Sequence, residues 1–328
     1  MRDCTIDDAQ NGSQVNTTIV GAHGLSSNVE LTNVVISTDI NRNRAIVRSE
    51  GAFVTVTNGL TNARADSLFE STVLGNIRGA ILLENHTVNS VNSSGTIFDA
   101  NGGNITVRDS GVTAAFNTNK VGDIRVGGAG QSGTLALERV SIDARSVIDV
   151  PIAISGASSV LIMESSALVF SVGSNLPPRR EMAIDATGGG RVFLTHNTFR
   201  NHQFTFGFNA FAIVGPNTGN SMQLLASNNL FVDPGSASGV FAFGSAGAGA
   251  VTIFGSPVNM TWTPTFGGTE QLPGTRVAPN PATLVFQADL FHLAANLAPR
   301  AASLPSSSLL DIDGATRSAQ PNFGCDEF

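Results

Sequence analysis

The sequence contains no tyrosine, one tryptophan (Trp262) and a single lysine (Lys120), and charged residues make up only 13% of its 328 positions. The formal net charge is −7, which argues against nucleic acid or an anionic membrane surface as a partner. The two cysteines, Cys4 and Cys325, lie near opposite ends of the chain. They therefore form neither a disulfide framework nor a metal-binding motif.

No run of 18 or more apolar residues occurs, so we predict no transmembrane helix. The opening residues, MRDCTIDD, lack the basic and apolar regions of a secretory signal peptide. The stretch CTIDD already has the pattern of a strand and shows no cap. We therefore expect the chain to be a fragment or the end piece of a longer protein.

Glycine, serine, threonine, asparagine, valine and alanine are abundant instead, a composition typical of strands and turns. One short strand and the turn after it recur along the chain, as in VELTNVVI (29–36), ITVRDSGV (105–112) and VFLTHNTF (192–199). The recurring turn residues are spaced 24 to 32 residues apart: Asp8, Asn33, Asn58, Asn85, Asp109, Arg139, Ser165, His196, Asn228 and Gly255.

An apolar residue or cysteine stands two and four residues before every one of these turn residues. This alternation predicts strands with one buried face, and its recurrence predicts the coils of a β-solenoid. For the first turn residue, the pair is Cys4 and Ile6, so we expect the Cys4 thiol to be buried. Further strands fit between the turns: AIVRS, TIFDA, DIRVG, PIAIS, MAIDA, AFAIVG and VFAFG.

A β-sandwich or barrel is the alternative to a solenoid. Strands that recur in one direction and with one spacing favour parallel stacking over the hairpins of those folds. Prolines become frequent from Pro257 onward, and proline cannot donate a ladder hydrogen bond. We therefore predict about ten parallel coils over residues 1–258 and an irregular, proline-rich capping segment over 259–328, because the last coil exposes strand edges.

Two regions carry a resemblance to known families. FESTVLGNIRGAILLEN (69–85) resembles the repeat unit of the polymorphic outer-membrane-protein family, although Arg78-Gly79 replaces its glycine pair. FHLAANLAPRAA (291–302), DIDGATR (311–317) and NFGCDEF (322–328) resemble the closing segment of secreted β-helix proteins. The resemblance implies a right-handed parallel β-helix of bacterial surface or secreted type, located outside the cell, and it implies no reaction.

Charged residues stand immediately before four successive turn residues: Glu84, Arg108, Glu138 and Glu164. Stacking would pair Arg108 with Glu84 and Glu138, and would bring Glu138 to about 5 Å from Glu164. Two carboxylates at that distance are candidates for a calcium site, or for the acid and nucleophile of a glycosidase. We favour the alternative, a solvated ladder of charges, to which Asp143 and Asp149 add nearby carboxylates.

The sequence has no complete set of the calcium-binding aspartates of pectate lyases or of the signatures of polygalacturonases. It also offers few aromatic rings on which sugars could stack. We therefore expect a non-catalytic extracellular or cell-surface segment, a stalk, adhesin or passenger-type module that binds a polysaccharide or a host or neighbouring cell surface. The alternatives are a polysaccharide lyase or glycoside hydrolase with its site on the outer face, and a carbohydrate binder resembling a phage tailspike.

Overall fold

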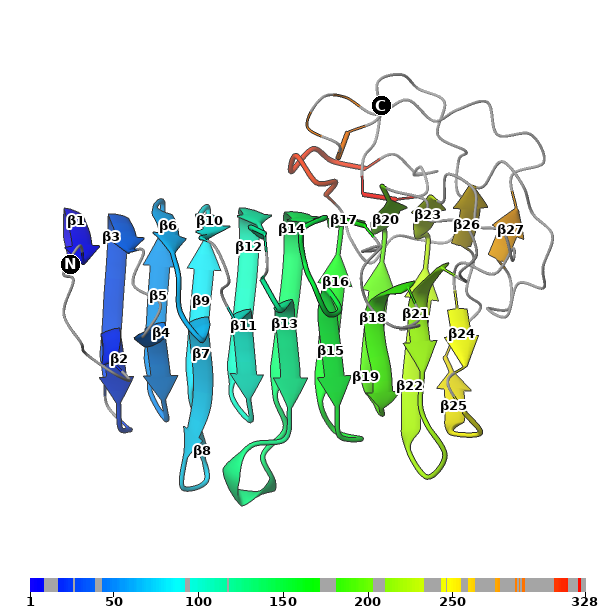
Figure 1. Cartoon of the computed structure of the whole chain (residues 1–328), viewed down its shortest axis with the longest axis horizontal. Helices are drawn as coiled ribbons and strands as arrows, with labels where there is room; N and C mark the ends of the chain where they lie inside the picture. Colours follow the sequence, from blue (N-terminus) through cyan, green and yellow to red (C-terminus); the bar gives the residue numbers. More distant parts are fainter. Residues whose placement is uncertain are drawn as a thin grey trace.

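The computed structural model describes residues 1–8, 17–25, 27–38, 43–91, 95–116, 118–171, 181–202, 210–232, 243–245, 247–254, 259–262, 275–277, 287, 289, 291–292, 310–317 and 324–325. These residues form an all-β, parallel β-solenoid in which short strands stack coil on coil (Figure 1). The fold class predicted from the repeat is therefore confirmed. The structure has about seven turns, however, rather than the ten predicted.

The described strands form two sheets that run along the solenoid. The larger sheet has 17 strands: β1 (Arg2–Asp8), β3 (Asn28–Thr38), β5 (Phe53–Thr57), β6 (Leu60–Ala63), β9 (Ala80–Glu84), β10 (Thr87–Ser90), β12 (Asn104–Thr113), β14 (Thr134–Ala144), β16 (Val160–Glu164), β17 (Ala167–Phe170), β19 (Gly190–Thr195), β20 (Thr198–Asn201), β22 (Ser221–Ser227), β23 (Leu230–Val232), β25 (Ala250–Ile253), β26 (Asn259–Trp262) and β27 (Thr275–Val277). In it, strands of successive coils pair in parallel, as β12 does with β14.

The smaller sheet has ten strands: β2 (Thr17–His23), β4 (Asn43–Glu50), β7 (Ser67–Leu74), β8 (Ile77–Arg78), β11 (Thr96–Asn101), β13 (Lys120–Arg125), β15 (Ile152–Ser155), β18 (Glu181–Gly188), β21 (Ala210–Gly215) and β24 (Phe243–Ser245). Each of the seven further strands predicted from the sequence overlaps one of them. β8 pairs antiparallel with β7 and forms a hairpin that projects from the body (Figure 1). A short 3₁₀ helix, η1 (Gly128–Gly130), lies between β13 and β14.

Each coil turns within the larger sheet at a residue whose φ is positive. Asparagine and aspartate adopt this left-handed conformation at the lowest cost of any residue other than glycine, which explains their frequency there. At the eight corner residues φ lies between 47° and 57°, and all eight are predicted turn residues: Asn33, Asn58, Asn85, Asp109, Arg139, Ser165, His196 and Asn228.

The prediction that Asp8 is the first turn residue is wrong. β1 pairs with the second half of β3, so Cys4 lies opposite Val34 and the corner falls at Asp3, where φ is 50°. Both registers direct Cys4 inward, because side chains alternate with a period of two on either side of a corner. Cys4 packs against the core but is only partly buried, not enclosed as predicted.

The last coil also differs from the prediction. Gly255 lies outside the described residues, and β25 is shifted by two positions, so that Ile253 rather than Val251 lies opposite Leu224. A shift of two residues keeps the same side chains on the inner face. For this reason the alternation of apolar residues could not distinguish the two registers.

The core consists of ladders of apolar side chains that stack from coil to coil. One ladder occupies the position two residues before each corner and is buried throughout: Leu31, Val56, Leu83, Val107, Leu137, Met163, Leu194 and Ala226. Two pairs of phenylalanine rings also pack against each other in the core. Their ring centroids are 5.8 Å apart for Phe69 and Phe98, and 5.4 Å apart for Phe199 and Phe231. Every turn therefore supplies apolar surface to one continuous core.

A second inner ladder is polar and begins one residue after the corner. The backbone N–H of Ser166, Asn197 and Asn229 donates in turn to the side-chain oxygen of Asn197, Asn229 and Asn259. The Nδ2 atoms of the three asparagines donate to backbone carbonyls of the preceding coil. The amides thus satisfy backbone groups that the corners remove from the sheet.

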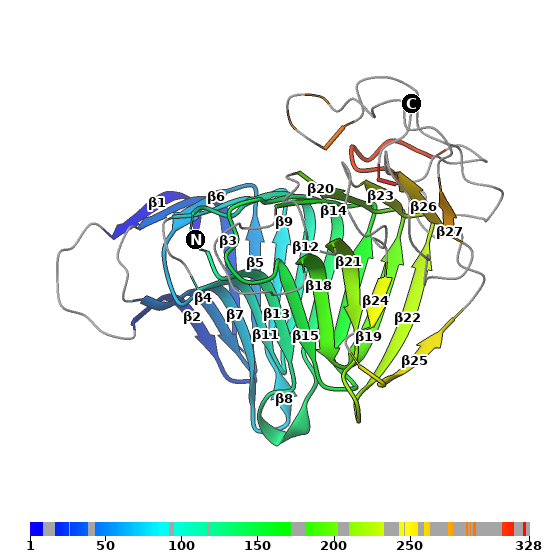
Figure 2. The ribbon, with the colours of Figure 1, turned by 45° about the vertical axis from the view of Figure 1, so that its right-hand side comes forward.

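The described residues after 258 include two strands and a segment that packs on the side of the solenoid. β26 pairs with β23, and β27 pairs with β26, so both extend the larger sheet. Residues 310–317 and 324–325 lie against the corners at Ser165 and Asn228 and not beyond the last strand (Figures 1 and 2). The corner side chains of Ser165, His196 and Asn228 are buried, whereas those at Asn33, Asn58 and Asn85 are exposed.

Candidate functional site

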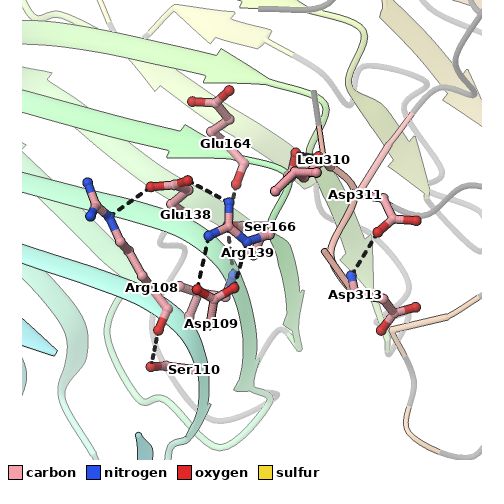
Figure 3. A network of polar contacts seen from close by, with 12 residues as sticks. Arg108, Asp109, Ser110, Glu138, Arg139, Glu164, Ser166, Leu310, Asp311 and Asp313 are labelled. Atoms are coloured by element: carbon pink, nitrogen blue, oxygen red, sulfur yellow. Dashed lines mark hydrogen bonds and ion pairs between the residues drawn. The ribbon is translucent and has the colours of Figure 1, made fainter. Parts of the chain in front are cut away.

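The four charged residues predicted to stack do lie in one row. Glu84, Arg108, Glu138 and Glu164 are successive partners on β9, β12, β14 and β16. The row runs directly beside the corners, and Figure 3 shows Arg108, Glu138 and Glu164 with the corner residue Arg139. The stacking geometry therefore places the two candidate carboxylates, Glu138 and Glu164, on adjacent strands.

Glu138 is held between two guanidinium groups. Its Oε2 lies 2.9 Å from Arg108 Nε, and its Oε1 lies 2.5 Å from Arg139 Nη1 (Figure 3). Arg139 also donates two hydrogen bonds to the carboxylate of Asp109, at 2.6 and 2.9 Å. The hydrogen bond with Asp109 is the largest cause that raises the pKa of Arg139 above its ordinary value. Two arginines and two carboxylates thus form a balanced network.

Arg108 was predicted to pair with both Glu84 and Glu138, and one of these two ion pairs forms. Among the ion pairs of the described residues, Arg108 pairs with Glu138, and a pair with Glu84 does not occur. Asp143 is bound by Arg145, and Asp149 lies 3.9 Å from Lys120. Within the described part of the chain, no group of three or more histidine, cysteine, aspartate or glutamate side chains is arranged to hold a metal ion.

A second row of charges, on the smaller sheet, was missed by the sequence analysis. Arg48, Glu70, Asp99 and Asp123 are successive partners on β4, β7, β11 and β13. Arg48 pairs with Glu70 at 3.4 Å, and Arg125 pairs with Asp99 at 2.8 Å and with Asp123 at 3.3 Å. The recurrence of an acidic residue in FES (69–71), FDA (98–100) and GDI (122–124) was the available signal.

Asp99 is the residue of this row with the most unusual electrostatics. Its side chain is buried, accepts hydrogen bonds from Arg125 and Ser67, and lies near Glu70 and Asp123. Burial raises the pKa of Asp99 to about 6, against the opposing charge of Arg125. A carboxyl group that exchanges its proton near pH 6 is common at functional sites and also in structural ion-pair networks. Because both oxygens are engaged, this arrangement fits the structural role.

The DIDGATR segment binds the solenoid through backbone and guanidinium contacts. Asp311 Oδ1 accepts hydrogen bonds from the N–H groups of Asp313 and Ala315, which shapes the turn. Arg317 donates to Leu310 O, Cys325 O and Ser165 Oγ. The hydrogen bond from Arg317 to Ser165 attaches the motif to the solenoid, while those of Asp311 stabilise its own turn.

No protein-family model matches the chain, and the comparisons with curated proteins and with solved structures gave no match either. The described residues include no helix with the length and hydropathy needed to cross a lipid bilayer. The site must therefore be interpreted from its own geometry.

Proposed function

We propose that this chain is a non-catalytic β-helix segment of an extracellular or cell-surface protein, a stalk, adhesin or passenger-type module. The observation that carries the proposal is the pairing of the charged side chains on the two sheets. Glu138 is fixed by Arg108 and Arg139, and Asp99 is fixed by Arg125. Carboxylates held in this way stiffen a ladder of strands and have few lone pairs left for a substrate proton or a calcium ion.

The extracellular location rests on the resemblance of residues 69–85 and 291–328 to bacterial surface and secreted β-helix proteins. A rigid parallel solenoid suits a stalk, since every coil is hydrogen-bonded to both neighbours and buries a shared core. Its long outer faces also suit a module that binds a polysaccharide or the surface of a host or neighbouring cell.

A carbohydrate-active enzyme is the second candidate, and one observation favours it. Glu138 and Glu164 are direct partners on adjacent strands, about 5 Å apart by the strand spacing, which is the separation of the carboxylates in retaining glycosidases. A lyase or hydrolase would use this pair on the outer face, with or without calcium. A tailspike-like carbohydrate binder without turnover would use the same face.

The experiment that tests the proposal is the release of reducing or unsaturated ends from a panel of uronate-containing and neutral polysaccharides, with and without calcium. We expect no release. Turnover that disappears in both Glu138→Gln and Glu164→Gln would overturn the non-catalytic proposal and identify the pair as the site. Arg191→Gln is the control. Arg191 is an exposed residue of the same sheet, and its substitution removes a charge that lies outside the network.

A further inference from the structure

One histidine of the C-terminal segment lies between two carboxylates. The Nδ1 atom of His292 contacts Asp289 Oδ2, and its Nε2 atom lies 3.0 Å from Asp313 Oδ1. Asp313 lies 21 positions further along the chain and is exposed, whereas His292 is half-buried. The imidazole ring therefore bridges two carboxylates that belong to different turns.

The first of these turns is held together by its own hydrogen bonds. Asp289 Oδ1 accepts hydrogen bonds from the backbone N–H groups of Phe291 and His292. The backbone N–H of Gln287 donates to His292 O. These bonds fix the position of the His292 ring relative to Asp289.

The second turn belongs to residues 310–317, beside the corners of the solenoid (Figure 3). Arg317 attaches this segment to the corner at Ser165, as described above. Asp313 is its contact with His292. The ring of His292 thus connects the turn at 287–292 to a segment that is itself docked on the solenoid.

The two contacts require a proton on both ring nitrogens. An ionised carboxylate only accepts hydrogen bonds, and a neutral imidazole has one donor and one acceptor nitrogen. A neutral ring can therefore donate to Asp289 or to Asp313 but not to both, whatever else the ring contacts. Burial raises the pKa of Asp289, but hydrogen bonds from His292 and from backbone N–H groups outweigh it, so that the pKa lies below its ordinary value. The proton therefore belongs to the imidazole and not to this carboxyl group.

We propose that protonated His292 is a pH-sensitive latch that holds the turn at 287–292 on the docked 310–317 segment. The latch is closed while the imidazolium donates to both carboxylates. When the ring loses its proton, one of the two hydrogen bonds is lost and the turn at 287–292 is released, while Arg317 keeps residues 310–317 on the solenoid. The inference goes beyond the proposed function and does not depend on it, since it concerns the C-terminal segment and not a bound ligand.

The direction of the pH dependence follows from the charges near the ring. In the described part of the chain, the ionisable groups in contact with His292 include Asp289 and Asp313, and Asp311 lies behind Asp313 and accepts its backbone N–H. Acidic neighbours favour the charged imidazole, so the folded ring should titrate above the ordinary midpoint of about 6.5. The latch is therefore fully present between about pH 5, where the carboxylates are ionised, and about pH 6.5. It is lost as the pH rises through the midpoint of the folded ring.

The test is an NMR titration of the His292 imidazole in the whole chain, with its signal assigned by its absence in His292→Gln. Asp313→Asn should move the midpoint about one pH unit lower, because it removes one of the two negative charges. Asp289→Asn should act in the same way, since its amide oxygen can still accept the N–H groups of the turn, and it is used if Asp313→Asn does not fold. Asp66→Asn is the control, at an exposed aspartate of the solenoid, and should leave the midpoint unchanged.

Hydrogen exchange, corrected for the intrinsic rate at each pH, measures the release itself. We expect the protection of the Gln287 and Phe291 amides to fall about tenfold between about pH 6 and 9, the effect of losing one charged hydrogen bond. In Asp313→Asn the protection of both amides should already be low at pH 6. The amide of Ala315, which donates to Asp311 in the docked segment, should stay protected throughout.

A His292 midpoint at or below about 6.5, or one that neither Asp313→Asn nor Asp289→Asn lowers, would overturn the latch. Protection of Gln287 and Phe291 that does not change with pH would overturn the release. An equal loss of protection at Ala315 would contradict a release confined to the turn at 287–292.

Discussion

Arg317 donates a hydrogen bond to Ser165 Oγ at 3.3 Å and so joins two residues that lie 152 positions apart in the chain. Ser165 in turn donates to Leu310 O at 2.7 Å, and Arg317 donates to Cys325 O at 3.0 Å. The arginine is 8% exposed. It therefore links a corner of the solenoid to residues 310–317 and 324–325 of the C-terminal segment.

Replacing Arg317 with alanine should detach this segment from the corner. The substitution removes the charged donor to the carbonyls of Leu310 and Cys325, a cost of about 1–3 kcal/mol in the free energy of unfolding. Cys325 is fully buried, so its thiol should react slowly with a disulfide reagent in the wild type and rapidly in the variant. Arg78→Ala, at an exposed arginine, is the control, and equal thiol rates in the two variants would contradict the attachment role.

Most of the fold follows from local patterns that the sequence displays directly. The corners from Asn33 to Asn228 could be predicted because each needs a left-handed residue at the end of an alternating strand. The first corner could not be predicted in this way, because Cys4 and Ile6 face inward whether the turn is at Asp3 or at Asp8. Register is set by pairing with β3, which is a contact between coils and not a local pattern.

The charge networks were only partly predictable, because they depend on side chains brought together by three-dimensional register. The row of Glu138 and Glu164 could be predicted because each residue directly precedes a recurring turn residue. The row of Glu70 and Asp99 could not be predicted from that pattern, because these residues lie on the smaller sheet, whose strands pair in a register of their own. The pairing of Arg139 with both Glu138 and Asp109 depends on side-chain reach, which periodicity does not contain.

Leu137→Asp tests the inward assignment of the main apolar ladder. Leu137 is buried between Val107 and Met163, so a carboxylate there would lie in the core without a partner. We expect a loss of several kcal/mol, mostly from desolvation of the charge. Glu164→Gln should be close to neutral in the same thermal melts. An unchanged melting temperature for Leu137→Asp would mean that the ladder does not face inward.

Acid should destabilise the protein through His86. Burial lowers the pKa of His86 to about 4, and its Nε2 lies 2.9 Å from Thr61 Oγ1. The unfolded chain takes up a proton near pH 6.5, so stability from this group is present above that pH and is lost as pH falls toward 4. The loss is roughly 3 kcal/mol. Urea unfolding of Asp99→Asn between pH 7 and 4 should show it, because the opposing titration of Asp99 is then removed. In that background His86→Gln should flatten the profile, while His23→Gln should not.

The titration of Asp99 should change the stability with pH in the opposite direction to that of His86. Its pKa is raised to about 6 by burial, so the folded state holds a proton that the unfolded state releases near pH 4. Its contribution is fully present below about pH 4 and is lost as pH rises through 6, by about 2–3 kcal/mol. Asp99→Asn should therefore make stability depend more steeply on acid than in the wild type, because the effect that opposes His86 is removed. An unaltered slope between pH 4 and 6 would show that Asp99 titrates normally.

Asn229→Ala tests whether the inner asparagine ladder is required for the corners to close. Asn229 Oδ1 accepts from the backbone N–H and the Nδ2 of Asn197, while its Nδ2 donates to Leu194 O at 3.0 Å. Alanine would leave these buried groups unsatisfied, at a cost of about 2–4 kcal/mol.

The matched control for this variant is Asn220→Ala. The Nδ2 of Asn220 also donates to a backbone carbonyl, that of Thr187 at 2.9 Å, but in an exposed position where water can replace it. We expect at most about 1 kcal/mol there. Hydrogen exchange adds a local measurement, since the amide of Asn197 should lose protection in Asn229→Ala before the strands further along the solenoid do. Similar losses of stability in both variants would mean that the buried ladder contributes no more than an ordinary surface hydrogen bond, and that packing of the apolar ladder alone holds the corners.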